Sequence, residues 1–238
     1  MSTKQLASER LLEAVVQIVR RMKPDEVMHE RMGQALFSDD GAVRNDARPT
    51  RDEWIMMSAL QLLNALSTAR DFKTKCEAIL RMKSVSNDDR ADWCRSLAWH
   101  YGYVLRERAR TFVNNLKTYL TPLGKEHTVQ TFLCGQASDF TKKTGPHLLD
   151  RGKHTHNFEV DDPLVAQVRM FELLSTHGEM QQLKPLMKQR AAKMRQHVKH
   201  QVAAQIDVIV AEVEKLVADS ERIWSIVFET IEKGSEAA

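Results

Sequence analysis

The chain has 238 residues, of which 42% are hydrophobic and 28% charged, and its formal net charge at pH 7 is +3. This length is sufficient for one large domain or two small ones, and the composition is ordinary for a globular protein. The small net charge excludes a protein that binds nucleic acid through overall basicity, and the lack of any apolar run of about 18 residues argues against a membrane-spanning helix.

The N-terminal residues and the cysteines predict a cytoplasmic protein. Charged residues interrupt the N-terminal segment, which therefore lacks the apolar stretch of a secretory signal. Cys76, Cys94 and Cys134 lie far apart, and no two of them show C-x-x-C spacing. Three cysteines without an export signal predict reduced thiols, and we expect all three to be small residues of the core.

The first half of the chain predicts three helices, besides a short one that Pro24 opens. Residues 4–22 carry an apolar stripe at helical spacing. This stripe consists of Leu12, Val15, Val16 and Val19. Thr50 and Glu53 form a capping box that begins the next helix, whose apolar segment 54–66 predicts a central position in the core. A third helix passes through Phe72 and Cys76 to Leu80.

The middle of the chain predicts three more helices. Ser86 to Asp89 offer an N-cap, and the next interruption after Gly102 is Pro122, so a helix of eight or nine turns is expected up to Leu120. A shorter helix is expected from about residue 128 to 142. Asp162 followed by Pro163 resembles an N-cap with proline at the first helical position, which predicts a helix over 163–174.

The last helix is expected to run from Pro185 to about Lys233, because no glycine or proline interrupts it. Its apolar residues recur at a period near 3.5, typical of a helix that lies against a partner helix. They are Val198, Val202, Ile206, Ile209, Val213, Leu216, Ile223, Val227 and Ile231. The sequence thus predicts an all-α multi-helix bundle domain over 1–178 and a long C-terminal helix over 179–238, which packs on the bundle or on a second copy in a homodimer.

One internal segment lacks a helical pattern and is rich in titratable residues. Three of the nine histidines, His147, His154 and His156, fall there within ten residues, beside Arg151 and Lys153. Polar residues concentrated on a loop between helices are typical of a functional site, because the rigid helices position them.

Arg151 and His156 match the R-x4-6-H signature of the HEPN superfamily of helical ribonucleases and nucleotide-binding proteins, which the segment and its flanking helices resemble. The resemblance implies that Arg and His of two subunits meet at a dimer interface and cleave RNA without metal. His156 is then the acid/base and Arg151 the phosphate clamp, with Lys153 and His154 as secondary candidates.

The spacing R-x4-H also occurs at Arg95 and His100 and at Arg195 and His200. Both pairs lie inside predicted helices, where a separation of five residues turns two side chains about 140° apart. We therefore expect that neither pair forms a site.

Two other interpretations of the histidine segment stay open. His154 and His156, with His147, Glu159 or Asp161, offer donors for a transition metal, although no second ligand cluster is visible. Alternatively the segment is a solvated loop without chemistry. Our leading hypothesis includes no metal and no cofactor.

The start of the last helix is basic. Lys188, Arg190, Lys193, Arg195 and Lys199 are followed by a largely acidic stretch from Asp207 onward. Such a helix end is suited to follow an RNA phosphate backbone, while a solvated face, or one that meets an acidic partner helix, is the alternative. The tryptophans and other aromatic residues occur mostly at core spacing and predict packing.

These patterns together predict a metal-independent endoribonuclease with RNA as its partner, and the resemblance implies a role in a toxin or antiviral system. The alternative is a non-catalytic helical scaffold or regulator that acts through dimerisation or contact with a regulatory protein. The ribonuclease requires both copies of Arg151 and His156 to face one shared cleft.

Overall fold

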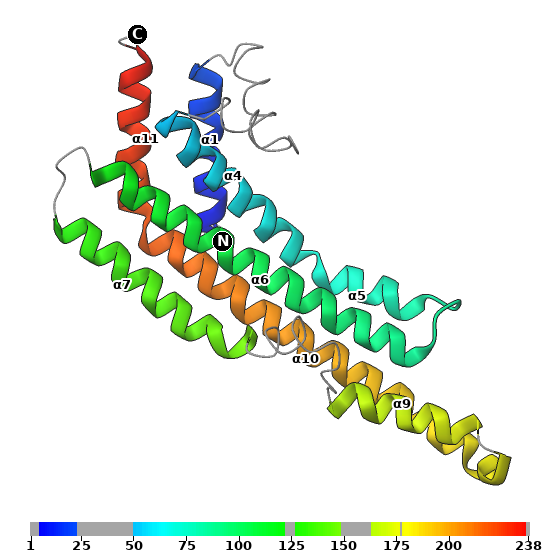
Figure 1. Cartoon of the computed structure of the whole chain (residues 1–238). Coiled ribbons are helices and arrows are strands. Elements are labelled where there is room, and N and C mark those ends of the chain that lie inside the picture. Colours follow the sequence, from blue (N-terminus) through cyan, green and yellow to red (C-terminus); the bar gives the residue numbers. More distant parts are fainter. Residues whose placement is uncertain (1–4, 23–49, 122–126, 149–162, 177, 237–238) are drawn as a thin grey trace, which may run out of the picture. The chain divides into compact units, whose positions relative to one another are not determined.

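A computed structural model describes residues 5–22, 50–121, 127–148, 163–176 and 178–236 of the chain. Within these ranges the protein is helical and contains no strand, which confirms the predicted all-α bundle with a long C-terminal helix (Figure 1). The α-helices are α1 (Ala7–Met22), α4 (Arg51–Arg70), α5 (Phe72–Arg81), α6 (Asn87–Leu120), α7 (His127–Thr144), α9 (Pro163–Thr176), α10 (Lys184–Asp219) and α11 (Glu221–Glu236). Two short 3-10 helices are η2 (Gly145–Leu148) and η3 (Gly178–Leu183). None of the described helices is long and apolar enough to cross a membrane.

The described residues divide into two compact units, neither of which is continuous in sequence. Unit 1 lies within residues 1–64, 107–140 and 213–238, and unit 2 within residues 65–106 and 141–212. Helices α4, α6, α7 and α10 each contribute residues to both units. The two predicted segments, 1–178 and 179–238, therefore both contribute to each unit.

In unit 1, α1 and α11 pack side by side (Figure 1). Arg10 of α1 donates two hydrogen bonds to the carboxylate of Glu221, from Nε at 2.7 Å and from Nη2 at 2.5 Å. The buried face of α1 is one position out of phase with the predicted stripe. It consists of Ala7, Leu11, Val15 and Ile18, whereas Leu12 is 45% exposed. The prediction for Leu12 was wrong because Leu11 and Ile18, also apolar, continue the helical spacing of Val15 equally well.

The predicted capping box at the start of α4 is confirmed. The amide N–H of Thr50 donates to Glu53 Oε2 at 2.6 Å, and the amide of Glu53 donates to Thr50 Oγ1 at 3.3 Å. These two bonds satisfy donors that the first turn of a helix leaves unpaired. The predicted N-cap of α6 is confirmed as well, because Ser86 Oγ accepts from the amide of Asp89 at 3.3 Å.

The prediction of one unbroken C-terminal helix was wrong, because the chain bends at Ser220 between α10 and α11. The Ser220 hydroxyl donates to the carbonyls of Leu216 at 2.8 Å and Val217 at 3.2 Å. The indole N–H of Trp224 also donates to the Val217 carbonyl, at 3.0 Å. Side chains thus bond carbonyls of the last turn of α10, and serine bonding of this kind bends helices without glycine or proline.

The apolar stripe of α10 and α11 is buried within the chain itself. All nine predicted stripe residues, from Val198 to Ile231, are buried. Their period near 3.5 reflects packing inside the two units, and the stripe is not an open surface for a second copy. The prediction of a homodimer then depends on the segment around Arg151, outside the described residues.

Two of the three cysteines occupy core positions as predicted. Cys76 in α5 and Cys94 in α6 are buried, whereas Cys134 in α7 is exposed. The prediction was wrong for Cys134 because α7 buries the face that carries Leu133 and Phe140, and Cys134 lies beside that face.

Candidate nucleic-acid interface

The predicted catalytic residues lie outside the described part of the chain. Arg151, Lys153, His154 and His156 belong to residues 149–162, between η2, which ends at Leu148, and α9, which begins at Pro163. The start of α9 is the one predicted from Asp162 and Pro163. The flanking helical elements therefore exist as expected, while the geometry of Arg151 and His156 stays a prediction.

The two other R-x4-H pairs do not form sites, as predicted. Arg95 is buried in α6 and its guanidinium lies 5.1 Å from the ring centre of Trp99, while His100 is exposed. Arg195 of α10 turns inward and His200 outward. Each helix directs the two members of its pair to different faces, which is the consequence of five residues at 100° each.

Of the residues proposed as ligands of a transition metal, only His147, in η2, lies inside the described ranges. Among the described residues no group of three His, Cys, Asp or Glu side chains is placed to hold a metal ion. The other proposed donors, including His154, His156 and Glu159, fall in residues 149–162.

The five predicted phosphate-binding cations of α10 separate into two sets. Lys188, Arg190 and Lys193 are exposed. Arg195 and Lys199 turn toward neighbouring helices of unit 2, where their side chains are 20% and 15% exposed. Both side chains therefore contribute to packing within unit 2, and each remains partly accessible to solvent.

Each inward cation pairs with a glutamate of another helix. Arg195 lies 2.8 Å from Glu172 Oε1 of α9, and Lys199 Nζ lies 2.7 Å from Glu77 Oε1 of α5. Burial lowers the pKa of Arg195, and the charge of Glu172 opposes this shift. The hydrogen bond from Lys199, together with its charge, lowers the pKa of Glu77. Both pairs tie α10 to helices that precede it in sequence.

The outward cations continue into two histidines on the same side of α10. Arg190, Lys193, His197 and His200 follow one another at steps of three, four and three residues, and all four are exposed. We call these four residues the basic face. Lys188 is exposed as well, but it lies about 160° from Arg190 around the helix and so is not part of this face. From Arg190 to His200 the basic face extends about 15 Å, because each helical residue rises about 1.5 Å. Steps of three and four residues in the sequence mark this stripe.

Acidic residues are absent from this part of the chain. Residues 180–206 contain no aspartate or glutamate. Within the described ranges, none of the four residues of the basic face forms an ion pair, and neither does Lys188. The face therefore keeps its positive charge available for an anionic partner.

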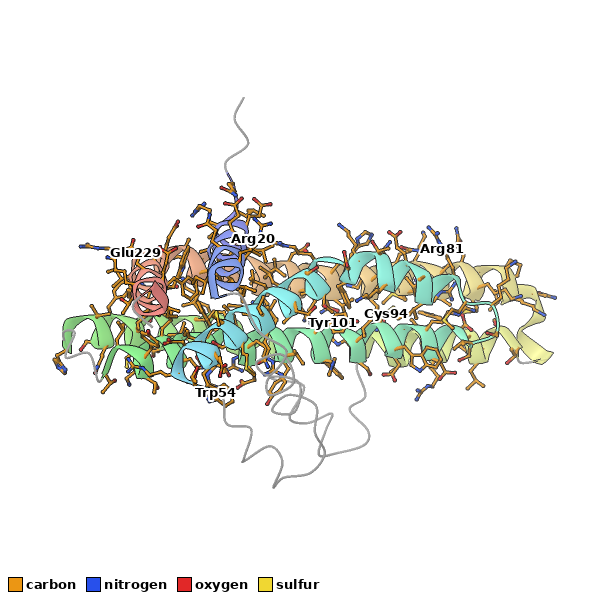
Figure 2. All side chains as sticks on the ribbon, turned by 90° about the horizontal axis from the view of Figure 1, so that it is seen from above. Arg20, Trp54, Arg81, Cys94, Tyr101 and Glu229 are labelled. Atoms are coloured by element: carbon orange, nitrogen blue, oxygen red, sulfur yellow. The ribbon has the colours of Figure 1, made fainter. Side chains whose placement is uncertain are left out.

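Unit 1 carries a separate hollow beside an exposed tryptophan. Trp54 of α4 is 50% exposed and lies on the outside of its helix (Figure 2), which contradicts its predicted role in packing. The hollow has a volume of about 430 Å³ and includes Arg51, Asn115 and Tyr119 in its lining. The Arg51 guanidinium lies 4.2 Å from the ring centre of Tyr119. The pKa of Tyr119 is raised to about 12, mainly by burial.

Comparison of the chain with family models, with curated proteins and with solved structures gives no match. The similarity to the HEPN superfamily accordingly stays the one drawn from Arg151, His156 and their flanking helices.

Proposed function

We propose that this protein binds RNA along the basic face of α10 and cleaves it without metal through Arg151 and His156. The observation that supports binding is the exposure of Lys188, Arg190 and Lys193 on a helix whose residues 180–206 include no acid. The cleavage step is supported by the R-x4-H spacing in a segment between two helical elements.

The chemistry of the basic face suits a phosphate backbone. Phosphates of one strand follow one another every 3.4 Å along a duplex axis, so a stripe of about 15 Å spans several of them. Lysine and arginine neutralise phosphates and release counterions, while imidazole N–H groups donate hydrogen bonds. Such contacts give affinity without base specificity.

The cleavage reaction requires a base, an acid and a group that stabilises the pentavalent phosphate. His156 takes the proton of a ribose 2′-OH as its oxygen attacks the adjacent phosphorus. The bond to the 5′-oxygen then breaks, a histidine returns a proton to that oxygen, and a 2′,3′-cyclic phosphate and a 5′-OH remain. Arg151 holds the phosphate oxygens and offsets their developing charge.

The binding step is tested with a labelled single-stranded RNA over a range of salt concentrations. The double variant Arg190→Gln and Lys193→Gln is expected to bind about 25-fold more weakly at 0.1 M salt, because each of the two lost contacts removes about 0.7 from the salt slope. The matched control replaces two other exposed cations, Lys142 and Lys215, by glutamine. Equal losses in both double variants would show that net charge, not the basic face, holds the RNA.

The cleavage step is tested with the same RNA in excess EDTA. Wild-type protein is expected to leave 2′,3′-cyclic phosphate ends, and His156→Ala and Arg151→Ala to lose cleavage while they retain binding. His127→Ala, at an exposed histidine of α7, is the control that keeps wild-type activity. Binding without cleavage by the wild type would leave an RNA-binding protein and remove the catalytic assignment.

A second candidate function, a non-catalytic interaction module, is supported by exposed apolar residues on α9. Leu173 is 67% exposed and Met170 lies one turn before it, also exposed. Side chains three residues apart lie next to one another on a helix, and contiguous exposed apolar side chains are a feature of protein contacts. If this function holds, light scattering shows that the wild-type protein is a dimer and that Leu173→Asp is a monomer. The wild-type protein then neither binds nor cleaves RNA.

A further inference from the structure

Two buried thiols from different helices meet in unit 2. Cys76 of α5 and Cys94 of α6 are 1% and 0% exposed. The Cys94 thiol donates a hydrogen bond to the carbonyl oxygen of Cys76 at 3.8 Å, and each thiol shifts the pKa of the other. Figure 2 marks the position of Cys94 on α6. The loop and helices between the two residues place them together although 18 positions separate them in sequence.

A lysine from a third helix lies near this pair. The ammonium group of Lys199 bonds Glu77, the residue after Cys76, at 2.7 Å. The hydrogen bond from Cys76 lowers the pKa of Cys94, and the charge of Lys199 lowers it further against the effect of burial. The same thiol–thiol hydrogen bond and burial raise the pKa of Cys76. The charge of Lys199 acts on both thiols in the direction that favours a thiolate.

We propose that Cys76 and Cys94 are a redox-sensitive dithiol that closes to a disulfide when the protein meets a peroxide. The Cys94 thiolate attacks one peroxide oxygen, the O–O bond breaks, and Cys94 sulfenic acid and, after uptake of a proton, water are formed. The Cys76 sulfur then attacks the sulfenic sulfur, and the Cys76 proton leaves with the hydroxyl as a second water. The two thiols are oxidised by two electrons and one hydrogen peroxide is reduced to two waters.

The surroundings of the pair decide which oxidant acts on it. Because both sulfur atoms are buried, hydrogen peroxide reaches them during local opening, whereas bulky disulfides such as oxidised glutathione react first with the exposed Cys134. The closed disulfide links α5 to α6 and restricts the unfolded chain, which stabilises the folded protein. A thiol reductant reopens it.

The test is oxidation of the full chain with hydrogen peroxide, followed by alkylation and peptide mapping without reductant. Wild-type protein is expected to lose two of its three free thiols, and a Cys76–Cys94 linked peptide, two hydrogen masses lighter than the sum of its parts, is expected to appear. The thermal midpoint rises by several degrees and returns after dithiothreitol. Recovery of both cysteines as alkylated thiols or as separate sulfinic acids would overturn the proposal.

Two variants separate this pair from the remaining thiol. Cys134→Ser is expected to form the linked peptide at the wild-type rate, whereas Cys94→Ser forms no linked peptide and shows no reversible rise in midpoint. The wild-type peptide map decides the proposal even where Cys94→Ser fails to fold. A disulfide found only between Cys134 residues of two chains would also overturn it.

Discussion

The two faces of α10 use the same residue types for different purposes. On the inward face, Arg195 and Lys199 lie beside the buried Val198 and Val202. Arg195 pairs with a glutamate of α9, and Lys199 pairs with a glutamate of α5. On the outward face, Arg190, Lys193, His197 and His200 are exposed and form no ion pair within the described ranges. Helical phase alone separates a cation that supports the fold from one that is available to a ligand.

The basic stretch of α10 therefore contains cations of two kinds, which differ in the side of the helix on which they lie. The inward series Ala191, Arg195, Val198 and Val202, in which only Arg195 is not fully buried, advances by steps of four, three and four residues. A cation within that series loses hydration and requires a carboxylate partner. Substitutions on the inward face should therefore affect stability, and those on the outward face should affect RNA binding.

The largest effect on stability is expected from Ile206→Ala on the inward face. Ile206 is buried, and removal of its side chain leaves a cavity that typically costs about 2–5 kcal/mol. The thermal midpoint of a protein of this size falls by about 2–4 °C for each kcal/mol. Calorimetry measures this fall, and RNA affinity of the folded variant should equal that of the wild type. Reduced affinity with an unchanged midpoint would reverse the assignment of the faces.

Most of the helical architecture was predictable from local signals. The capping box of Thr50 and Glu53, the Ser86 cap and the proline at position 163 all begin helices as predicted, because each satisfies backbone donors of the first turn or fixes φ. The bend at Ser220 was not predictable in this way. There the Ser220 hydroxyl and the Trp224 indole N–H bond carbonyls of the last turn of α10, and neither residue type by itself marks the end of a helix.

Exposure was less predictable than helix position. Leu12 and Trp54 fit an apolar stripe by spacing but lie at the surface, because tertiary packing selects one of several overlapping apolar faces. In α10, extension of the apolar stripe by one turn from Val198 would have placed Arg195 inside. The Cys76–Cys94 pair has no sequence signal, since its spacing of 18 matches no recognised motif.

The two faces of α10 are compared directly when one arginine on each face is replaced by glutamine. Arg195→Gln is expected to destabilise the protein by about 1–2 kcal/mol, because it breaks a half-buried pair and leaves Glu172 without its partner. Arg190→Gln should leave the midpoint unchanged and weaken RNA binding about fivefold at 0.1 M salt. Thermal unfolding and a binding titration of both variants measure these effects. Equal effects of the two substitutions in either measurement would contradict the division of α10 into two faces.

The smallest effect concerns the pH dependence of the pair between Glu77 and Lys199. The hydrogen bond from Lys199 lowers the pKa of Glu77 in the folded protein, so the pair stabilises the fold above the unfolded-state pKa of about 4.3. This contribution is lost as the pH falls through the lowered folded-state pKa. The difference in thermal midpoint between wild type and Glu77→Gln should thus be constant from pH 8 to about pH 5 and shrink on further acidification.

The control for this experiment is Glu229→Gln, at an exposed carboxylate of α11 that Figure 2 labels. Its midpoint should follow that of the wild type at every pH, because no ion pair holds Glu229 within the described ranges. A difference for Glu77→Gln that persists unchanged at pH 3 would show that glutamine alters packing instead of charge. A difference absent already at pH 7 would show that the pair between Glu77 and Lys199 does not stabilise the fold.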